Sequence, residues 1–428
     1  MATKIKYALF WWLRKIGLFG KIRRMKRIYE TLLGEHFASL RQMAFISGPR
    51  QAGKTTLAKS TLSSARYFSY DSPTDAALIM RGGEAIARSL GFSSEEKSIN
   101  QGAVIFDEIH KYSRWKNMLK GFFDVYADGR KLQVAVTGSA RLNVYKRGGD
   151  SLMGRYFHYR LHPLSVGEIG SSDISTNELF RKPVETDKST IDLLLSLGGF
   201  PEPFLDGTMK FKQRWHRMRL EQIFTEDLRD LSRVQDIRQI RQLAELLSAR
   251  VTGGINIASL ASDIGVSQPT VANWISLLES VYFIFEIRPW YKNVASSIRK
   301  QPKMYLWDWS VVADMGARRE NFVASHLFKA VNWWTDCGLG DFELCYLRDK
   351  MQREVDFLIV KDGEPFMLVE CKSSFSEDLS PALLHFQKTL GVKLAWQVAF
   401  DRDVSGIVPD ESNSPSRIAV ADLLKILP

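Results

Sequence analysis

The residues best placed to do chemistry lie between positions 48 and 56. The run "GPRQAGKT" (48–55) fits the pattern G-x-x-x-x-G-K-[ST], and a second threonine follows it. In this pattern the glycines let backbone N–H groups wrap phosphate oxygens, the lysine reaches the β- and γ-phosphates, and the Ser/Thr hydroxyl binds Mg²⁺. The sequence therefore predicts an ATP site, with Mg²⁺ at Thr55. Its expected residues are Gly48, Arg50, Gln51, Ala52, Gly53, Lys54, Thr55 and Thr56.

The segments on either side of this loop are those that it needs. Residues 43–47, "MAFIS", read as a short apolar strand, and the residues after the loop read as a helix. The N-terminal dipole of such a helix favours phosphate. A chance match would seldom fall between a strand and a helix, so a glycine-rich turn without nucleotide is the less favoured alternative.

A second apolar run, about fifty residues further on, ends in two acids. Residues 103–106 are continuously apolar, as expected of a central parallel strand. Asp107 and Glu108 follow at its C-terminal end, where α/β sheets place ligands. We expect Asp107 to hold Mg²⁺ through water, and Glu108 to orient and deprotonate the attacking water. Two unrelated surface acids are the alternative.

A third strand, residues 132–140, ends on Thr137 and Ser139. A hydroxyl there could reach the γ-phosphate or the attacking water, and an ordinary Ser/Thr-rich turn is an equal alternative. Together "GPRQAGKTT", "IFDEIHKYSRW", "VTGSA" and "LMGRYFHYRLHPLSVGEI" resemble the prokaryotic AAA-type ATPases joined to a C-terminal domain of unknown function, over roughly residues 26–375. This resemblance implies catalytic roles for Ser139 as a sensor and Arg155 as an arginine finger or sensor. The finger would act in trans within a homo-oligomer, and a surface salt bridge is the alternative for Arg155.

Three more charged residues stand on a predicted hairpin near the end of the chain. Asp356 lies in the apolar run "EVDFLIV"; after the turn "KDGEP", Glu370 and Lys372 lie in "FMLVECKSS". Residues two apart in a strand share a face, so Glu370 and Lys372 should point together, and Asp356 can meet them. Two converging carboxylates favour a divalent cation, Mg²⁺ or Mn²⁺, beside which Lys372 would position the attacking water.

The pattern D-x13-E-x-K resembles the PD-(D/E)xK restriction-endonuclease-like superfamily, although Val355 stands where the namesake motif has proline. The resemblance adds Glu320, on a predicted helix over residues 318–334. It implies metal ligands Glu320, Asp356 and Glu370, with Lys372 catalytic and Gln387 a further candidate. The alternatives are an ordinary charged hairpin and a docking module on an inactive nuclease fold.

The region from residue 255 predicts a helix-turn-helix. Gly265 breaks one helix, and Ser267 caps the next, with Pro269 in its first turn. The second helix would present Gln268, Thr270, Asn273 and Trp274, although Trp274 could equally be buried. The β-rich run "YFIFEI" would complete a winged helix. Contact with DNA and service as a rigid arm against the nucleotide domain are equally favoured.

Composition sets the remaining expectations. The 428 residues are 45% hydrophobic and 25% charged, as in ordinary soluble proteins, and the three cysteines are odd in number, which suggests reduced thiols in a cytoplasm. Residues 1–30 hold nine Lys or Arg against one acid, so they carry +8 of the net +11. The rest is near neutral, and overall charge is weak evidence for nucleic-acid binding. The stretch "YALFWWLRKIGLF" is too short to span a bilayer; a helix packed on the body is favoured over one lying on lipid or phosphate.

The expected fold class is α/β, with a P-loop AAA-type core, a helical lid, a winged helix-turn-helix and a restriction-endonuclease-like α/β domain. We expect a Mg²⁺-dependent ATPase that acts on DNA and that has a metal-dependent nuclease domain gated by nucleotide. The alternative is a nucleotide-dependent DNA- or protein-binding switch whose nuclease-like domain is inactive. The expected boundaries are 1–28 for a basic aromatic helix, 29–170 for the ATPase core, 171–235 for the lid, 236–292 for the winged helix and 293–428 for the nuclease-like domain.

Overall fold

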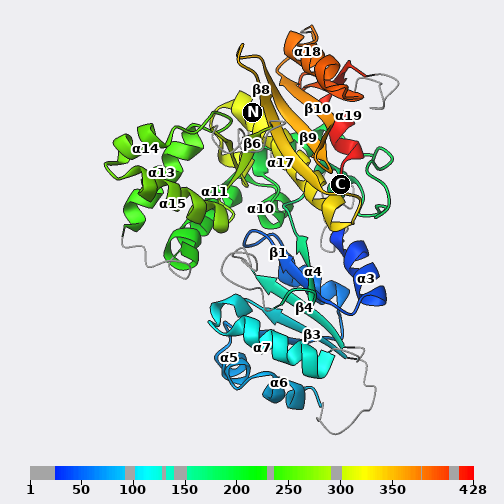
Figure 1. Cartoon of the computed structure of the whole chain (residues 1–428), viewed down its shortest axis with the longest axis vertical. Coiled ribbons are helices and arrows are strands. Elements are labelled where there is room, and N and C mark those ends of the chain that lie inside the picture. The colour runs from blue at the N-terminus through cyan, green and yellow to red at the C-terminus, as the bar shows by residue number, and fades with distance from the viewer. Residues whose placement is uncertain are drawn as a thin grey trace.

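The computed structural model describes residues 25–91, 102–127, 132–138, 152–228, 236–290, 301–376, 378–403 and 414–428. The expected basic helix over residues 1–28 and the sensor position Ser139 lie largely or wholly outside these ranges. Two sheets organise the described chain, one at each end of the molecule, and a group of helices projects beside the second sheet (Figure 1).

The first sheet has five parallel strands in the order β2-β3-β4-β1-β5. Its strands are β1 (Met43–Ser47), β2 (Arg66–Ser69), β3 (Gly102–Asp107), β4 (Leu132–Gly138) and β5 (Tyr156–Arg160). β1 lies between β4 and β5 and is buried along its whole length, as its continuous apolar sequence predicts. The loop after β1 and the acids after β3 therefore lie at the same edge of the sheet.

Helices cover both faces of this sheet. Alternate residues of β1 pack into two separate apolar clusters, with Ala44 and Ile46 on the face of α3 and α4, and Met43 and Phe45 on the other face. The helices of this half are α3 (Tyr29–Ser39), α4 (Lys54–Thr61), α5 (Pro73–Met80), α6 (Gly83–Ser89), α7 (Trp115–Phe122) and α8 (Val166–Gly170), with the short turns η1 (Ile109–Lys111) and η2 (Phe123–Ala127).

Helices follow in the middle of the chain. They are α9 (Lys188–Leu197), α10 (Pro201–Asp206), α11 (Met209–Gln222), the π-turn η3 (Ile223–Asp227), α13 (Ile237–Ala249), α14 (Ile257–Ile264) and α15 (Gln268–Ser280). Gly265 ends α14 in a left-handed conformation, and the Ser267 side chain accepts the N–H of Thr270, so the sequence-based prediction of this turn is confirmed. On α15, Gln268 and Asn273 are exposed, whereas Trp274 is buried.

The second sheet is mixed, with seven strands in the order β12-β11-β10-β9-β8-β6-β7. Its strands are β6 (Ile284–Pro289), β7 (Lys303–Leu306), β8 (Phe342–Arg348), β9 (Glu354–Lys361), β10 (Glu364–Lys372), β11 (Leu394–Ala399) and β12 (Ser416–Ala419). Its helices are α17 (Met315–Asp336), α18 (Pro381–Leu390) and α19 (Val420–Ile426), with the turn η4 (Trp309–Val311). β6 pairs with both β7 and β8, so this sheet contains strands from both sides of the expected domain boundary at residue 292.

The expected hairpin is confirmed, because β9 and β10 pair antiparallel. Asp362 and Gly363 form its turn, both with positive φ, as two-residue hairpin turns require. The long helix α17 packs against this sheet and also against β5 of the first sheet.

The C-terminal helix α19 packs on α8 of the first half. The Ser165 hydroxyl donates to the carbonyl of Pro428 at 2.9 Å. A Cβ on Gly167 would lie 2.0 Å from the Leu427 carbonyl oxygen, so only glycine permits this approach. In the parts of the chain that the structure describes, no helix is long and apolar enough to cross a bilayer, and all three cysteines are free thiols.

Candidate nucleotide site and acidic cluster

The phosphate-binding loop joins β1 to α4, and two of its positions require glycine. Gly48 has φ 151°, and a Cβ there would lie 2.2 Å from the carbonyl oxygen of Leu161. Gly53 has φ 96° and is the N-cap of α4. The buried Lys54 ammonium donates to the carbonyls of Gly48 and Pro49 at 2.9 and 2.8 Å. Burial lowers the pKa of Lys54 to about 8, against the attraction of nearby acids.

Asp107 accepts hydrogen bonds from the hydroxyl groups of one helix and two strands. Its Oδ2 accepts the Thr55 hydroxyl at 3.0 Å and the Tyr67 hydroxyl at 2.6 Å, and its Oδ1 accepts the hydroxyl of Thr137. Thr137 of β4 pairs with Asp107 of β3 in the sheet, and Thr55 lies in the first turn of α4, directly after the loop. The structure thus brings Thr55 and Asp107 together as the sequence predicts. Tyr67 is a further residue that contacts Asp107, and no local sequence motif predicts it.

Glu108 directly follows β3 in an unusual backbone conformation. Its φ is 54°, a left-handed value that is uncommon for residues other than glycine and recurs at functional sites. Its backbone N–H donates to the carbonyl of Thr137 at 3.0 Å. Burial lowers the pKa of Lys54 and opposes the raised pKa of Arg50, and the charge of Glu108 acts upward on both. The predicted base therefore lies close enough to the loop for its charge to act on these two cations.

Arg50 and Gln51 of the loop turn toward the helical segment. The Arg50 Nη1 donates to Glu226 Oε2 at 2.7 Å and to Asp227 Oδ1 at 2.9 Å. The amide of Gln51, which has φ 64°, donates to the Gln222 side chain at 3.5 Å. No sequence motif singles out residues 226 and 227. Adjacent acids ending a basic helix were the only available signal.

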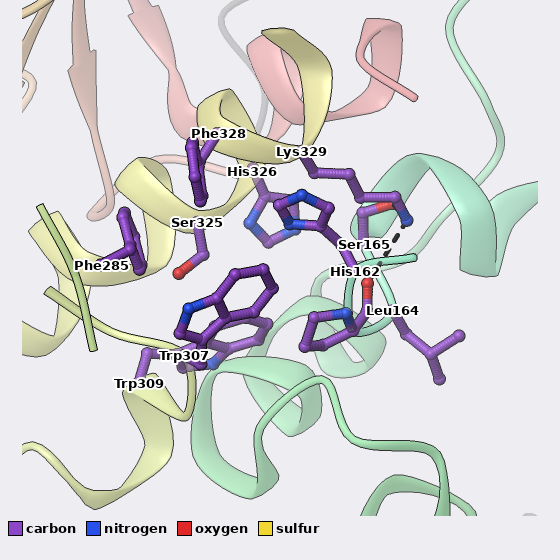
Figure 2. Close-up of a pocket in the computed structure, with 11 residues that line it drawn as sticks. His162, Leu164, Ser165, Phe285, Trp307, Trp309, Ser325, His326, Phe328 and Lys329 are labelled. Atoms are coloured by element: carbon purple, nitrogen blue, oxygen red, sulfur yellow. Dashed lines mark hydrogen bonds between the residues drawn. The ribbon is translucent and has the colours of Figure 1, made fainter. Parts of the chain in front are cut away.

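A buried ion network holds the other side of the loop. Arg27 donates to the carbonyl of Ala52 and to Glu168, both at 2.6 Å. Lys329 of α17 donates to Glu168 at 2.6 Å. It also donates to the Ser165 hydroxyl at 2.8 Å (Figure 2). Thr56, also predicted to bind ATP, is exposed on the first turn of α4.

The small cavity beside this network is not a ligand site. It lies between residues 162–165, the aromatic side chains of Phe285 and Trp307, and α17 (Figure 2). Its volume is about 10 Å³, at the lower limit for a single water molecule. The packing here joins the two halves of the molecule closely.

Arg155 lies away from the loop of its own chain. It precedes β5, where Tyr156 pairs with Met43 at the start of β1, whereas the loop follows the end of β1. At about 3.3 Å per residue, the five residues of β1 separate them by roughly 16 Å. Arg155 forms a two-pronged ion pair with Asp124, at 2.6 and 3.0 Å. Arg155 and this loop are therefore not brought together within one chain.

The residues predicted for the nuclease-like site do converge. Glu320 comes from α17, Asp356 from β9, and Glu370 and Lys372 from β10. The Lys372 ammonium lies 3.1 Å from Glu370 Oε1. Burial raises the pKa values of Glu320 and Glu370 to about 7, and the charge of Asp356 adds to both shifts. Gln387 donates instead to the Ser414 hydroxyl at 3.4 Å.

Lys303 of β7 lies among these acids, and no sequence motif predicts its presence there. Its ammonium is 2.7 Å from Glu354 Oε1 and 3.4 Å from both Glu320 Oε1 and Asp356 Oδ1. Burial opposes its charge, yet the three carboxylates raise the pKa of Lys303.

The cluster is not arranged as a ready metal site. Across the described ranges, no three His, Cys, Asp or Glu side chains are placed to hold one metal ion. The carboxylates that were predicted as ligands are instead balanced by lysine. One observation still fits a cation, because Glu370 Oε2 is buried and has no hydrogen-bond partner among the residues that the structure describes. We call residues 303, 320, 354, 356, 370 and 372 the acidic cluster.

Three family models match parts of the chain. Residues 40–170 match an AAA domain, residues 188–321 a domain of unknown function (DUF8612), and residues 315–405 another domain of unknown function (DUF4143). The first match covers the parallel sheet with its phosphate-binding loop and Asp107. This part of the chain is therefore similar to AAA-type domains, and the match supports an AAA-type ATPase.

Two proteins that are similar over much of this chain are described as uncharacterized proteins. One from Mycobacterium tuberculosis is 23% identical over 341 residues, which cover 76% of this chain and 69% of that protein. One from Methanocaldococcus jannaschii is 22% identical over 295 residues, covering 62% and 60%. Among solved structures, the Walker-type ATPase of Pyrococcus abyssi is 16% identical with a TM-score of 0.40, covering 69% of this chain and 96% of that one. The Orc1 protein of Aeropyrum pernix, solved in complex with DNA, is 13% identical with a TM-score of 0.32, covering 69% and 91%. These TM-scores describe only a partial overlap of folds.

Proposed function

We propose that this chain is a Mg²⁺-dependent ATPase that acts on DNA. The observation that carries the hydrolytic part is the bond between Thr55 and Asp107, which joins the phosphate-binding loop to the acid-bearing strand. These two oxygen groups would hold Mg²⁺, which neutralises phosphate charge when bound. The donor set fits, since both side chains are hard oxygen ligands at one edge of the sheet.

The other residues of the site have distinct roles in this proposal. The N–H groups of residues 48–53 and the N-terminus of α4 would hold the phosphates. Lys54 would exchange its carbonyl partners for phosphate oxygens. Glu108 would accept a proton from the attacking water. Ser139 would sense the γ-phosphate, and Arg155 would act only on the nucleotide of a second copy.

Two variants test hydrolysis. Lys54→Ala should abolish ATP binding, and Glu108→Gln should bind ATP but hydrolyse it about 10²–10⁴-fold more slowly, the usual contribution of a general base. Phosphate release and ATP affinity are the measurements. Lys388→Ala, at an exposed position of α18, is the matched control. Wild-type turnover by Glu108→Gln would remove Glu108 from the mechanism.

DNA contact is assigned to the exposed face of α15. Gln268 and Asn273 are exposed there, whereas the burial of Trp274 withdraws it from base contact. Amide side chains can read adenine through paired hydrogen bonds, each such contact contributing about 1–3 kcal/mol. The double variant Gln268→Ala with Asn273→Ala should therefore bind duplex DNA at least about tenfold more weakly in fluorescence anisotropy. Unchanged affinity would leave α14 and α15 as a rigid arm.

A second candidate function is metal-dependent DNA cleavage by the acidic cluster. The convergence of Glu320, Asp356, Glu370 and Lys372 favours it, together with the unpartnered oxygen of Glu370. The test is cleavage of single- and double-stranded DNA with Mg²⁺ or Mn²⁺, with Lys372→Ala as control. Cleavage should also differ among no nucleotide, ATP and a non-hydrolysable analogue if ATP gates the cluster. No cleavage by a chain that hydrolyses ATP would favour a binding switch with an inactive nuclease-like domain.

A further inference from the structure

The π-turn η3 is attached to the phosphate-binding loop through one guanidinium. Arg50, two residues after the first glycine of the loop, donates from Nη1 to both Glu226 and Asp227, at 2.7 and 2.9 Å. The Asp227 side chain is only 11% exposed, whereas that of Glu226 is 52% exposed. π-turns within helices frequently occur at functional sites.

The carboxylate of Asp227 shares its surroundings with the charges of the nucleotide site. Burial raises the pKa of Asp227 to about 6; Arg50 opposes this shift, and Glu108 adds to it. The charge of Asp227 also acts to raise the pKa of Lys54, against the lowering by burial. The same small region therefore holds Asp227, the predicted base and both cations of the loop.

We propose that Glu226 and Asp227 compete with the terminal phosphate of a bound nucleoside triphosphate for Arg50. The inference rests on the proposed ATPase function and adds η3 as the element that responds to the nucleotide. Arginine binds phosphate oxygens through paired charge-assisted hydrogen bonds. A polyphosphate and the two carboxylates would also repel each other. A triphosphate that engages Arg50 thus weakens the hold of the loop on η3, and by linkage η3 weakens the hold of the loop on the triphosphate.

Removing the carboxylate charges tests this reciprocity. Asp227→Asn combined with Glu226→Gln should tighten binding of a non-hydrolysable ATP analogue by about tenfold, within the usual range of coupling between sites. ADP binding should change much less, because ADP lacks the terminal phosphate. Glu221→Gln is the matched control, since Glu221 lies on α11, which leads into η3, and pairs with Arg241 of α13 at 2.7 Å. In an Arg50→Ala background the selective gain for the ATP analogue should disappear.

A second readout follows η3 itself. In the full-length chain, amide hydrogen exchange over residues 219–228 should increase on addition of the ATP analogue and much less on addition of ADP. An affinity gain for the ATP analogue that is no larger than the gain for ADP would overturn the competition. Unchanged amide exchange over residues 219–228 would overturn it as well. Lys54→Ala separates this failure from a wider one. Lys54-dependent ATP binding that is indifferent to the acids overturns the competition alone, whereas no ATP binding by the wild-type chain overturns the ATPase proposal as well.

Discussion

Replacing Glu168 by glutamine tests the buried ion network that joins the phosphate-binding loop to α17. The carboxylate accepts bonds from Arg27 Nε at 2.6 Å, Lys329 Nζ at 2.6 Å and the backbone N–H of Ile28 at 3.0 Å. Its side chain is fully buried. Burial opposes ionisation, but Arg27 and Lys329 lower the pKa of Glu168 to about 2. The carboxylate is therefore charged at neutral pH and balances two cations.

Glutamine keeps the shape of the side chain but removes its charge. Two buried cations would then face a neutral amide, and one of its oxygens would become an N–H₂ donor. Removing one partner of a buried ion pair costs about 3–5 kcal/mol of unfolding free energy. At about 2 °C per kcal/mol, a value typical of larger domains, the melting temperature should fall by about 6–10 °C.

Thermal unfolding followed by circular dichroism measures this fall. The control is Glu84→Gln on α6, because Glu84 is 64% exposed in its ion pair with Arg88. Exposed pairs contribute about 0–1 kcal/mol, so the control should melt within about 2 °C of wild type. A melting temperature for Glu168→Gln within that same interval would refute the reasoning, since the network would then contribute no more than a surface pair.

Three further predictions concern a glycine of the phosphate-binding loop, two buried histidines and the lysine within the acidic cluster. Gly48→Ala should weaken ATP binding at least tenfold in a fluorescence titration, because the new Cβ would lie 2.2 Å from the Leu161 carbonyl oxygen; wild-type affinity would contradict this. Burial lowers the pKa of His326 to about 3 and that of His162 well below its usual value. The unfolded chain takes up these protons below about pH 6.5, so each histidine should reduce stability by about 1.4 kcal/mol per pH unit as the pH falls below that value. Urea unfolding between pH 7 and 5 measures this slope, which His326→Gln should reduce. Lys303→Met should leave three carboxylates without their central cation and so strengthen Mn²⁺ binding in calorimetry; unchanged binding would show that this lysine does not exclude the metal.

Local features of the fold could be predicted from the sequence because short spacings specify them. The loop at residues 48–55, the cap at Ser267 and the turn at Asp362 each depend on the backbone preferences of a few neighbouring residues. The meeting of Glu320 with the β9–β10 hairpin could be predicted only through resemblance, since 36 residues separate Glu320 from Asp356.

Long-range ion pairs could not be predicted, because no periodicity relates their partners. Arg50 meets Asp227 across 177 positions, and Lys303 meets Asp356 across 53. Burial also decided one alternative that sequence left open, since Trp274 packs into the core rather than outward. Such contacts depend on how whole elements pack, which single-sequence patterns do not specify.

The helix α17 links the ion network beside the phosphate-binding loop to the acidic cluster. Glu320 and Lys329 lie nine positions apart on it, about 13.5 Å along its axis. Lys329 is tied through Glu168 to Arg27, which holds the loop at Ala52. Twelve of the 22 residues of α17 are buried, so bending between its two contacts would disrupt both packing and helix hydrogen bonds. A displacement that passes along this route must therefore move α17 as a rigid body, and would carry Glu320 relative to the strands that hold Asp356 and Glu370.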